Sequence, residues 1–166
     1  RLQQRRDGYR RAAHQKLPGQ ENQIDPERLT TAAQQILDGL LVHLRSVPPL
    51  GLRVARWLRT DYPDLNPLQE RQIMRELATN ERTDTPDLRR RIPRKVFDAT
   101  QTVNAAFAIA SADMLGHPEL TRPYTSFLKE GQSLVDLLDD IPPEPEHDRE
   151  LIDAWGEQLQ SSEWYQ

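Results

Sequence analysis

The residues in this sequence that are best suited to chemistry are cations. Five of them lie between positions 89 and 95: Arg89, Arg90, Arg91, Arg94 and Lys95. Guanidinium groups match the geometry of carboxylates and phosphates, so this segment could bind an acidic protein surface, nucleotide phosphates or nucleic acid. No aromatic residue is interleaved for base stacking, and a pI of about 5.6 is not typical of nucleic-acid binders. A solvated loop leading into a helix is the alternative interpretation.

No pattern typical of catalysis or metal binding occurs in the sequence. It contains no cysteine, which excludes disulfides, thiolate nucleophiles and cysteine-based zinc sites. The four histidines form no H-E-x-x-H arrangement, and His43 is predicted to be a structural histidine near the inward face of its helix. Neither a phosphate-binding glycine loop nor a nucleophile elbow is found. The sequence therefore predicts a protein that is not an enzyme and that has no metal site and no cofactor.

Charge is distributed unevenly along the chain, although the net charge is only -4. Residues 1–16 are basic, whereas residues 136–157 are rich in aspartate and glutamate. Ends of opposite sign either contact each other, bind two different partners, or form two solvated arms.

Apolar residues recur at helical spacing in several segments, and no segment shows the alternation of a strand. The sequence predicts an all-α fold, a multi-helix bundle with a polar N-terminal helix and an acidic C-terminal helical tail. Pro48 and Pro49 are predicted to end the helix that follows Asp25, because proline lacks the amide hydrogen that a helix needs. The further helices are expected at residues 50–60, 66–78, 93–115, 123–138 and 148–159, with Leu68, Ile73, Met74 and Leu77 inward in the second of these.

Three regions follow from this pattern. Residues 1–23 are expected to form a basic helix and linker, 24–141 the bundle core, and 142–166 an acidic, proline-rich linker, amphipathic helix and tail. The tail helix presents an apolar stripe that includes Trp155, so it either folds back on the bundle or docks in the groove of a partner. Trp155 is for this reason a candidate partner contact.

Two stretches of the chain resemble the Ras GTPase-activating domain, especially the version found in IQGAP-type scaffold proteins. The first contains the Val47-Pro48-Pro49 turn, the Gly51-Leu52-Arg53 step and the closing Tyr62-Pro63-Asp64. The second runs from Arg94-Lys95-Val96-Phe97 to Arg122-Pro123-Tyr124 and the following residues up to Lys129. Together they cover roughly residues 33–141 in the family order.

The resemblance lacks two features of that family. The arginine-finger loop has no counterpart in this sequence, and the interval from Leu65 to Arg94 does not match the family signature. An arginine finger stabilises the charge of the phosphoryl-transfer transition state, so a chain without it would bind a GTPase without activating it. The resemblance implies a small GTPase as a partner, with Arg53, Arg56, Arg94 and Lys95 as candidate contacts.

These observations predict a non-catalytic helical protein-protein interaction module of a larger scaffold or regulator. The alternative is a nucleic-acid-associated accessory domain that uses residues 1–16 and 89–95. No apolar run approaches the roughly 20 residues of a membrane span, and no signal-peptide core follows Arg1. The protein is expected to be cytoplasmic, and the absence of an initial methionine predicts that the chain is a fragment.

Overall fold

The structure of the protein is a computed structural model that describes residues 26–159, except for the side chains of residues 26–38, 41, 45, 88 and 91. Within the described residues, all regular structure is helical, which confirms the predicted all-α class. The α-helices are α2 (Pro26–Asp61), α3 (Asn66–Glu81), α4 (Pro86–Arg91), α5 (Arg94–Leu115), α6 (Leu128–Asp140) and α7 (Asp148–Gln158). Short 3₁₀ helices are η1 (Pro63–Leu65), η2 (Pro118–Phe127) and η3 (Pro145–His147). The predicted basic helix at residues 1–16 lies outside the described residues.

The chain divides into two compact units, Arg1–Gln35 and Ile36–Gln166, and the boundary lies inside α2. The described part of the first unit is the N-terminal part of this helix. The other described elements belong to the second unit.

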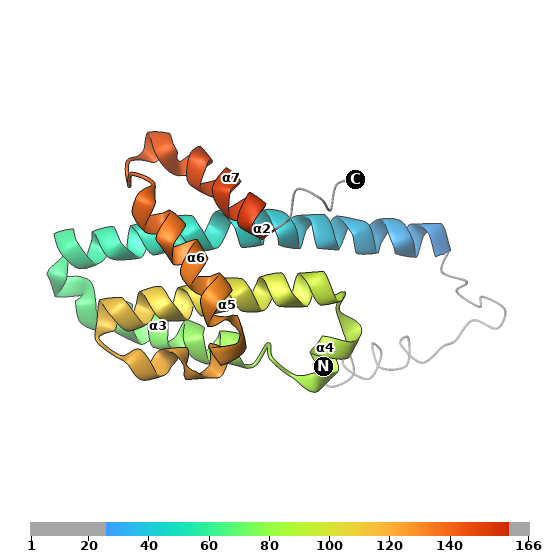
Figure 1. Cartoon of the computed structure of the whole chain (residues 1–166), viewed down its shortest axis with the longest axis horizontal. Coiled ribbons are helices and arrows are strands. Elements are labelled where there is room, and N and C mark those ends of the chain that lie inside the picture. The colour runs from blue at the N-terminus through green and yellow to red at the C-terminus, as the bar shows by residue number, and fades with distance from the viewer. Residues whose placement is uncertain (1–25, 160–166) are drawn as a thin grey trace, which may run out of the picture. The chain divides into compact units, whose positions relative to one another are not determined.

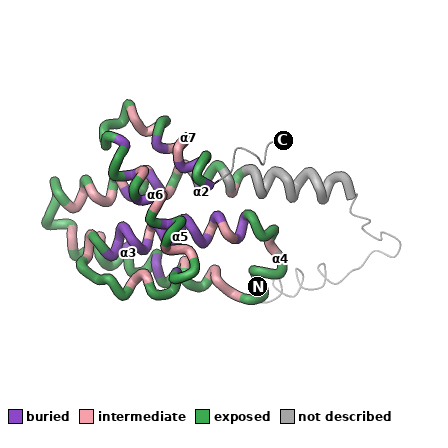
Figure 2. Tube along the Cα trace, in the orientation of Figure 1, coloured by how far each residue is buried: buried purple, intermediate pink, exposed green. Residues whose placement is uncertain are grey.

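The core of the second unit is built around α5. This helix contacts α6, η2 and α3 (Figure 1), and Figure 2 shows buried residues along much of its length. Small residues allow this close packing: a Cβ atom added to Gly131 of α6 would lie 2.8 Å from the Cβ atom of Ala105 and 2.9 Å from the amide nitrogen of Ala106. The sequence predicted the bounds of α5 almost to the residue, because Pro93 precedes it and Gly116 ends it. A helix that is apolar on most sides is typical of the centre of a bundle.

Buried amides on α5 fasten the loop between α3 and α4. The side-chain nitrogens of Gln101 and Asn104 each donate a hydrogen bond to the hydroxyl oxygen of Thr83, at 3.2 Å. The Thr83 hydroxyl in turn donates to the carbonyl oxygen of Asn80 at 2.6 Å. These bonds compensate the cost of burying polar groups in the bundle.

The predicted break at Pro48 and Pro49 is wrong, because α2 continues through both prolines to Asp61. A proline inside a helix removes a backbone hydrogen bond and costs about 3 kcal/mol. Tertiary packing offsets this cost: Leu44 on one side of the pair, Pro49 itself and Leu52 beyond it are all buried. The continuous α2 therefore replaces the two helices that the sequence predicted here.

The predicted boundary between residues 141 and 142 does not separate α7 from the core. Leu151, Trp155 and Leu159 of α7 and its end are buried in the same apolar cluster as Leu134 of α6 and Leu52 of α2. Of the two alternatives for the tail helix, the structure shows that it folds back on the bundle. Trp155 is fully buried, so it is a core residue and not a surface for a partner.

Candidate functional site

The predicted contact residues on α2 are engaged with the acidic C-terminal region. Arg53 donates from Nη1 to Asp148 Oδ1 at 2.7 Å, and from Nη2 to the carbonyl oxygens of Ile141 at 3.1 Å and Pro142 at 2.6 Å. Its side chain is only 8% exposed. Arg56 forms an ion pair with Asp139 of α6. Both arginines therefore hold the end of α6 and the linker against α2, and Arg53 presents little surface to a partner.

The basic segment at residues 89–95 is partly neutralised by neighbouring carboxylates. Arg89 donates to both carboxylate oxygens of Asp84, at 2.7 and 2.8 Å, and its guanidinium lies 5.2 Å from the ring centroid of Phe97. Arg94 Nε lies 3.4 Å from Asp98 Oδ2, and this pair is exposed. A stretch of paired cations is a weaker phosphate site than the sequence implied.

The remaining cations of this segment are spread over two helices. Arg90 on α4 is exposed and donates to the carbonyl oxygen of Pro86 at 3.1 Å, while Lys95 at the start of α5 is exposed to solvent. The side chain of Arg91 lies outside the described residues. Arg53, Arg56 and the basic segment belong to different elements, and Trp155 is in the core, so the predicted contacts do not form one site.

Several large apolar side chains of the second unit are exposed to solvent on α2. Val47, Val54 and Trp57 of α2 have 53%, 51% and 50% of their surface exposed. They lie on one face of the helix with the half-buried Leu50, at spacings of three and four residues. We call these four residues the outer stripe. In Figure 2 this part of α2 is mostly exposed or intermediate, in contrast to α5.

A groove runs beside the outer stripe. It is a cavity of about 610 Å³ between α2 and α3, with Phe107 of α5 at its base, and we call it the α2–α3 groove. Its walls include Val47 and Val54 of the outer stripe on one side and Leu65 and Leu68 on the other. Leu68 is 57% exposed and Leu65 is 42% exposed. Exposed apolar side chains that gather in this way are typical of interaction surfaces.

Most residues that line the groove are apolar, and the polar ones are His43, Gln69, Gln72 and Glu76. Gln69 donates from Nε2 to the carbonyl oxygen of Ala55 at 2.6 Å, which ties α3 to α2 at the floor of the groove. Glu76 lines the same cavity, and burial raises the pKa of its carboxyl group above the usual range. His43, predicted to face inward, is exposed and lines the groove. Because most of its lining residues are apolar, the groove is suited to binding an apolar surface.

Two predictions for α3 are wrong for the same reason. Leu68 and Met74 were expected to face the core together with Ile73 and Leu77, and only the last two are buried. Helical spacing identifies apolar positions but does not show which of them the rest of the chain covers. The number of large apolar residues on α2 and α3 could have indicated the groove, because these helices carry more of them than one buried face needs.

A second apolar cavity lies on the same side of α2 as Arg53. It has a volume of about 600 Å³ and is lined by α2, the end of α6 and the proline-rich linker, with Leu50, Val54 and Trp57 among its walls. The outer stripe is therefore flanked by a cavity on each side, and Val54 lines both.

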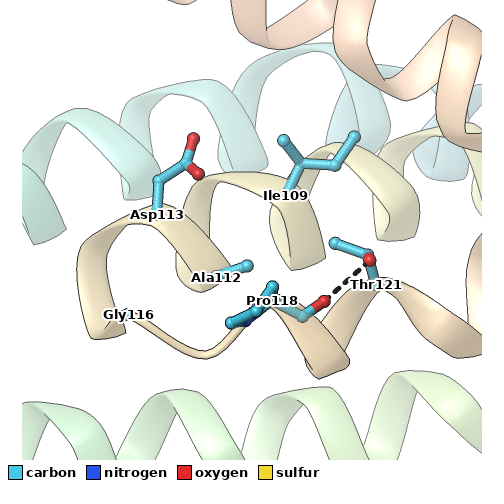
Figure 3. Close-up of a pocket in the computed structure, with 6 residues that line it drawn as sticks. All are labelled: Ile109, Ala112, Asp113, Gly116, Pro118 and Thr121. Carbon is cyan, nitrogen blue, oxygen red and sulfur yellow. Dashed lines mark hydrogen bonds between the residues drawn. The ribbon is translucent and has the colours of Figure 1, made fainter.

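The cavity at the C-terminal end of α5 has a different character. It holds about 350 Å³ and is lined by Ile109, Ala112, Asp113, Gly116, Pro118 and Thr121 (Figure 3). The Thr121 hydroxyl donates to the carbonyl oxygen of Pro118 at 2.9 Å, and Gly116 adopts a left-handed conformation with φ 72° that ends the helix. Both features stabilise the turn between α5 and η2.

Within the part of the chain that the structure describes, no three acidic or histidine side chains gather to hold a metal ion. None of its helices has the length and apolar character that crossing a bilayer requires. No family model, no curated protein and no solved structure matches the chain. The resemblance to the Ras GTPase-activating domain stays a prediction.

Proposed function

We propose that the chain is a non-catalytic helical interaction module of a larger scaffold or regulator. It binds an apolar helix of another polypeptide chain along the outer stripe and the α2–α3 groove. The observation that supports this most directly is the pair of exposed apolar walls, formed by Val47 and Val54 on α2 and by Leu65 of η1 and Leu68 of α3. Each of these residues would leave water when a helix is laid between them, which favours association.

The spacing of the side chains on α2 agrees with this occupant. A helix in a groove inserts one row of side chains spaced by three and four residues, and the outer stripe offers a matching row. Glu76 and His43 lie at the groove, where they can meet the polar edge of such a helix. A small GTPase, the partner implied by the resemblance, would have to be recognised through exposed cations such as Arg90, Arg94 and Lys95, which lie on other helices.

Site-specific photo-crosslinking tests the proposal. A benzophenone side chain at position 68 should form a covalent adduct with a defined helical segment of one polypeptide, identified by mass spectrometry and reproduced with the purified partner. The matched control is position 74, because Met74 is also exposed and apolar and lies on α3 but lines a different cavity. Val54→Asp in the same chain should abolish the adduct, since it puts a charge into the apolar wall.

Two results would overturn the proposal. One is an adduct from position 68 no stronger than that from position 74. The other is an adduct that persists unchanged in the Val54→Asp variant while circular dichroism shows an intact fold.

A further inference from the structure

We propose that Glu76 selects the occupant of the α2–α3 groove, and that this occupant is an amphipathic helix with a lysine or arginine that pairs with the Glu76 carboxylate. This inference rests on the proposed function, because it names the chemical class of the partner that binds the same groove.

Glu76 is the one carboxylate among the described residues that line the groove. It lies on the same face of α3 as Leu68, Gln72 and Ile73, which also line the groove. Glu76 follows Leu68 by eight residues, which is roughly 12 Å along the helix axis at 1.5 Å per residue. The α3 side of the groove therefore begins with exposed leucines and ends with a negative charge.

Within the part of the chain that the structure describes, no cation compensates this charge. The carboxylate of Glu76 forms no ion pair and no hydrogen bond there, whereas Arg53 and Arg56 of α2 are paired with Asp148 and Asp139. Burial alone raises the pKa of the Glu76 carboxyl group, and no nearby cation lowers it. The groove therefore combines apolar walls with one unpaired carboxylate.

An unpaired carboxylate beside apolar walls discriminates between helices. A wholly apolar helix would remove water from the charge of Glu76 without replacing the lost hydrogen bonds, which costs free energy. A helix with an aspartate or glutamate at this point would be repelled. A lysine or arginine forms a charge-assisted hydrogen bond with the carboxylate, which is stronger than a bond between neutral groups. Charge complementarity therefore favours a basic amphipathic helix over an apolar or an acidic one.

The geometry of the groove determines where this cation lies on the partner helix. The hydrogen bond from Gln69 to the carbonyl oxygen of Ala55 places Val54 and Leu68 at about the same level along the groove. An apolar side chain inserted between these two walls by a helix that lies along α3 is roughly two turns from Glu76. The partner therefore carries its cation roughly seven or eight residues from that apolar side chain.

A peptide-display selection tests the inference. The probe is a phage-displayed library of helical peptides with two fixed leucines on one turn and all other positions randomised, selected on the purified 166-residue chain. Peptides that bind in the groove are those whose binding is abolished by Val54→Asp. Among them, lysine and arginine should exceed aspartate and glutamate at least roughly threefold at the position two turns from the leucines.

Charge exchange in the chain should change this preference. On Glu76→Lys the selection should enrich aspartate and glutamate at the same position, because the sign of the charge in the groove is reversed. Glu70→Lys is the matched control, since Glu70 is an exposed glutamate of the same helix that does not line the groove. It should leave the preference for lysine and arginine unchanged. Circular dichroism shows whether both variants keep their fold.

Calorimetric titration with one enriched synthetic peptide measures the ion pair with a milder variant. Glu76→Gln should weaken the binding of this peptide at least roughly threefold, whereas Glu70→Gln should not change it. If the cation of the peptide is replaced by glutamine, the effect of Glu76→Gln should disappear, because the two charges act as a pair.

The outcomes separate this inference from the proposed function. Groove-binding peptides with the same charge preference on the wild-type and Glu76→Lys chains, or with equal affinity for the wild-type and Glu76→Gln chains, overturn the role of Glu76 and leave the proposed function standing. A selection that yields no peptide dependent on Val54 also overturns the inference. Photo-crosslinking at position 68 then decides the proposed function separately: a specific adduct retains it, and the absence of one overturns it as well.

Discussion

The helix α5 and the C-terminal half of α2 are both apolar over much of their circumference, but other elements of the chain cover α5 more completely than α2. α6, η2 and α3 pack against α5, so that nearly every side chain from Val96 to Ala112 is at least half-buried. On α2, one face packs against the core through Leu44 and Leu52 and the other carries the outer stripe. An apolar pattern shows that a surface must leave water, but it does not show whether the same chain or another one covers it.

The difference has a cause in residue size. α5 presents alanines where α6 crosses it, and Gly131 lets the two backbones approach closely. The outer stripe consists of valine, leucine and tryptophan with glycines beside it, which is a ridge with open space on its flanks. Small residues favour intimate packing within the chain, whereas an exposed ridge is suited to a partner.

The largest expected effect separates the two faces of α2. Leu52→Ala removes a fully buried side chain and should lower the free energy of unfolding by about 2–5 kcal/mol. Val54→Ala, two residues away on the outer stripe, should change it by less than about 0.5 kcal/mol in the monomer. Urea denaturation at low protein concentration measures both. Equal losses for the two variants would contradict the assignment of one covered and one uncovered face.

A smaller effect is expected at the crossing of α5 and α6. Gly131→Ala brings a methyl group against Ala105 and the backbone of Ala106, and should destabilise the fold by about 1–3 kcal/mol. Gly51→Ala is the control within α2, where the added methyl group meets no atom within 4 Å. It should stabilise the helix by about 0.5–1 kcal/mol, because alanine is a better helix former than glycine. Thermal unfolding of the two variants should therefore shift in opposite directions.

The smallest effect is expected at Tyr124, which packs in the α5 core. Burial, together with the carboxylates of Glu81 and Asp84, raises the pKa of its phenol from the ordinary 10.0 to about 12. A phenol that holds its proton more tightly when folded costs stability as pH rises between these two values. Tyr124→Phe should remove this alkaline loss. At neutral pH it should change the free energy of unfolding by less than about 1 kcal/mol, because the hydroxyl has no hydrogen-bond partner among the described residues.

Denaturant titrations at pH 8 and above 10 provide the measurement for Tyr124. A wild-type stability that falls no more steeply than that of the Phe variant would mean that the phenol is accessible to water. The packing of η2 against α5 would then be looser than that of a sealed core.

Local sequence patterns predicted several elements well. α3, α5 and α7 begin and end within a few residues of their predicted bounds, because proline, glycine and helical spacing are local signals. The helix predicted at residues 123–138 overlaps α6, which begins later, at Leu128. The end of α2 was not predicted correctly, because the cost of Pro48 and Pro49 is local whereas the burial that offsets it involves α5, α6 and α7.

The candidate site was predicted less well than the fold. Arg53 and Arg56 were candidates because of the family resemblance, and the segment at residues 89–95 because of its charge. The structure pairs Arg53, Arg56, Arg89 and Arg94 with carboxylates of the same chain. The exposed walls at Val54, Leu65 and Leu68 carry no distinctive motif. Such a surface is found only by comparing the apolar residues of the sequence with those that are buried in the structure.

The sequence by itself determined that the protein is helical and where most of its helices lie, because these properties depend on residues three or four positions apart. Tertiary structure decided which apolar faces meet each other, that α2 passes through two prolines, and that Trp155 is in the core. Those outcomes depend on contacts between residues far apart in the chain, and their energies decide which faces stay open to a partner.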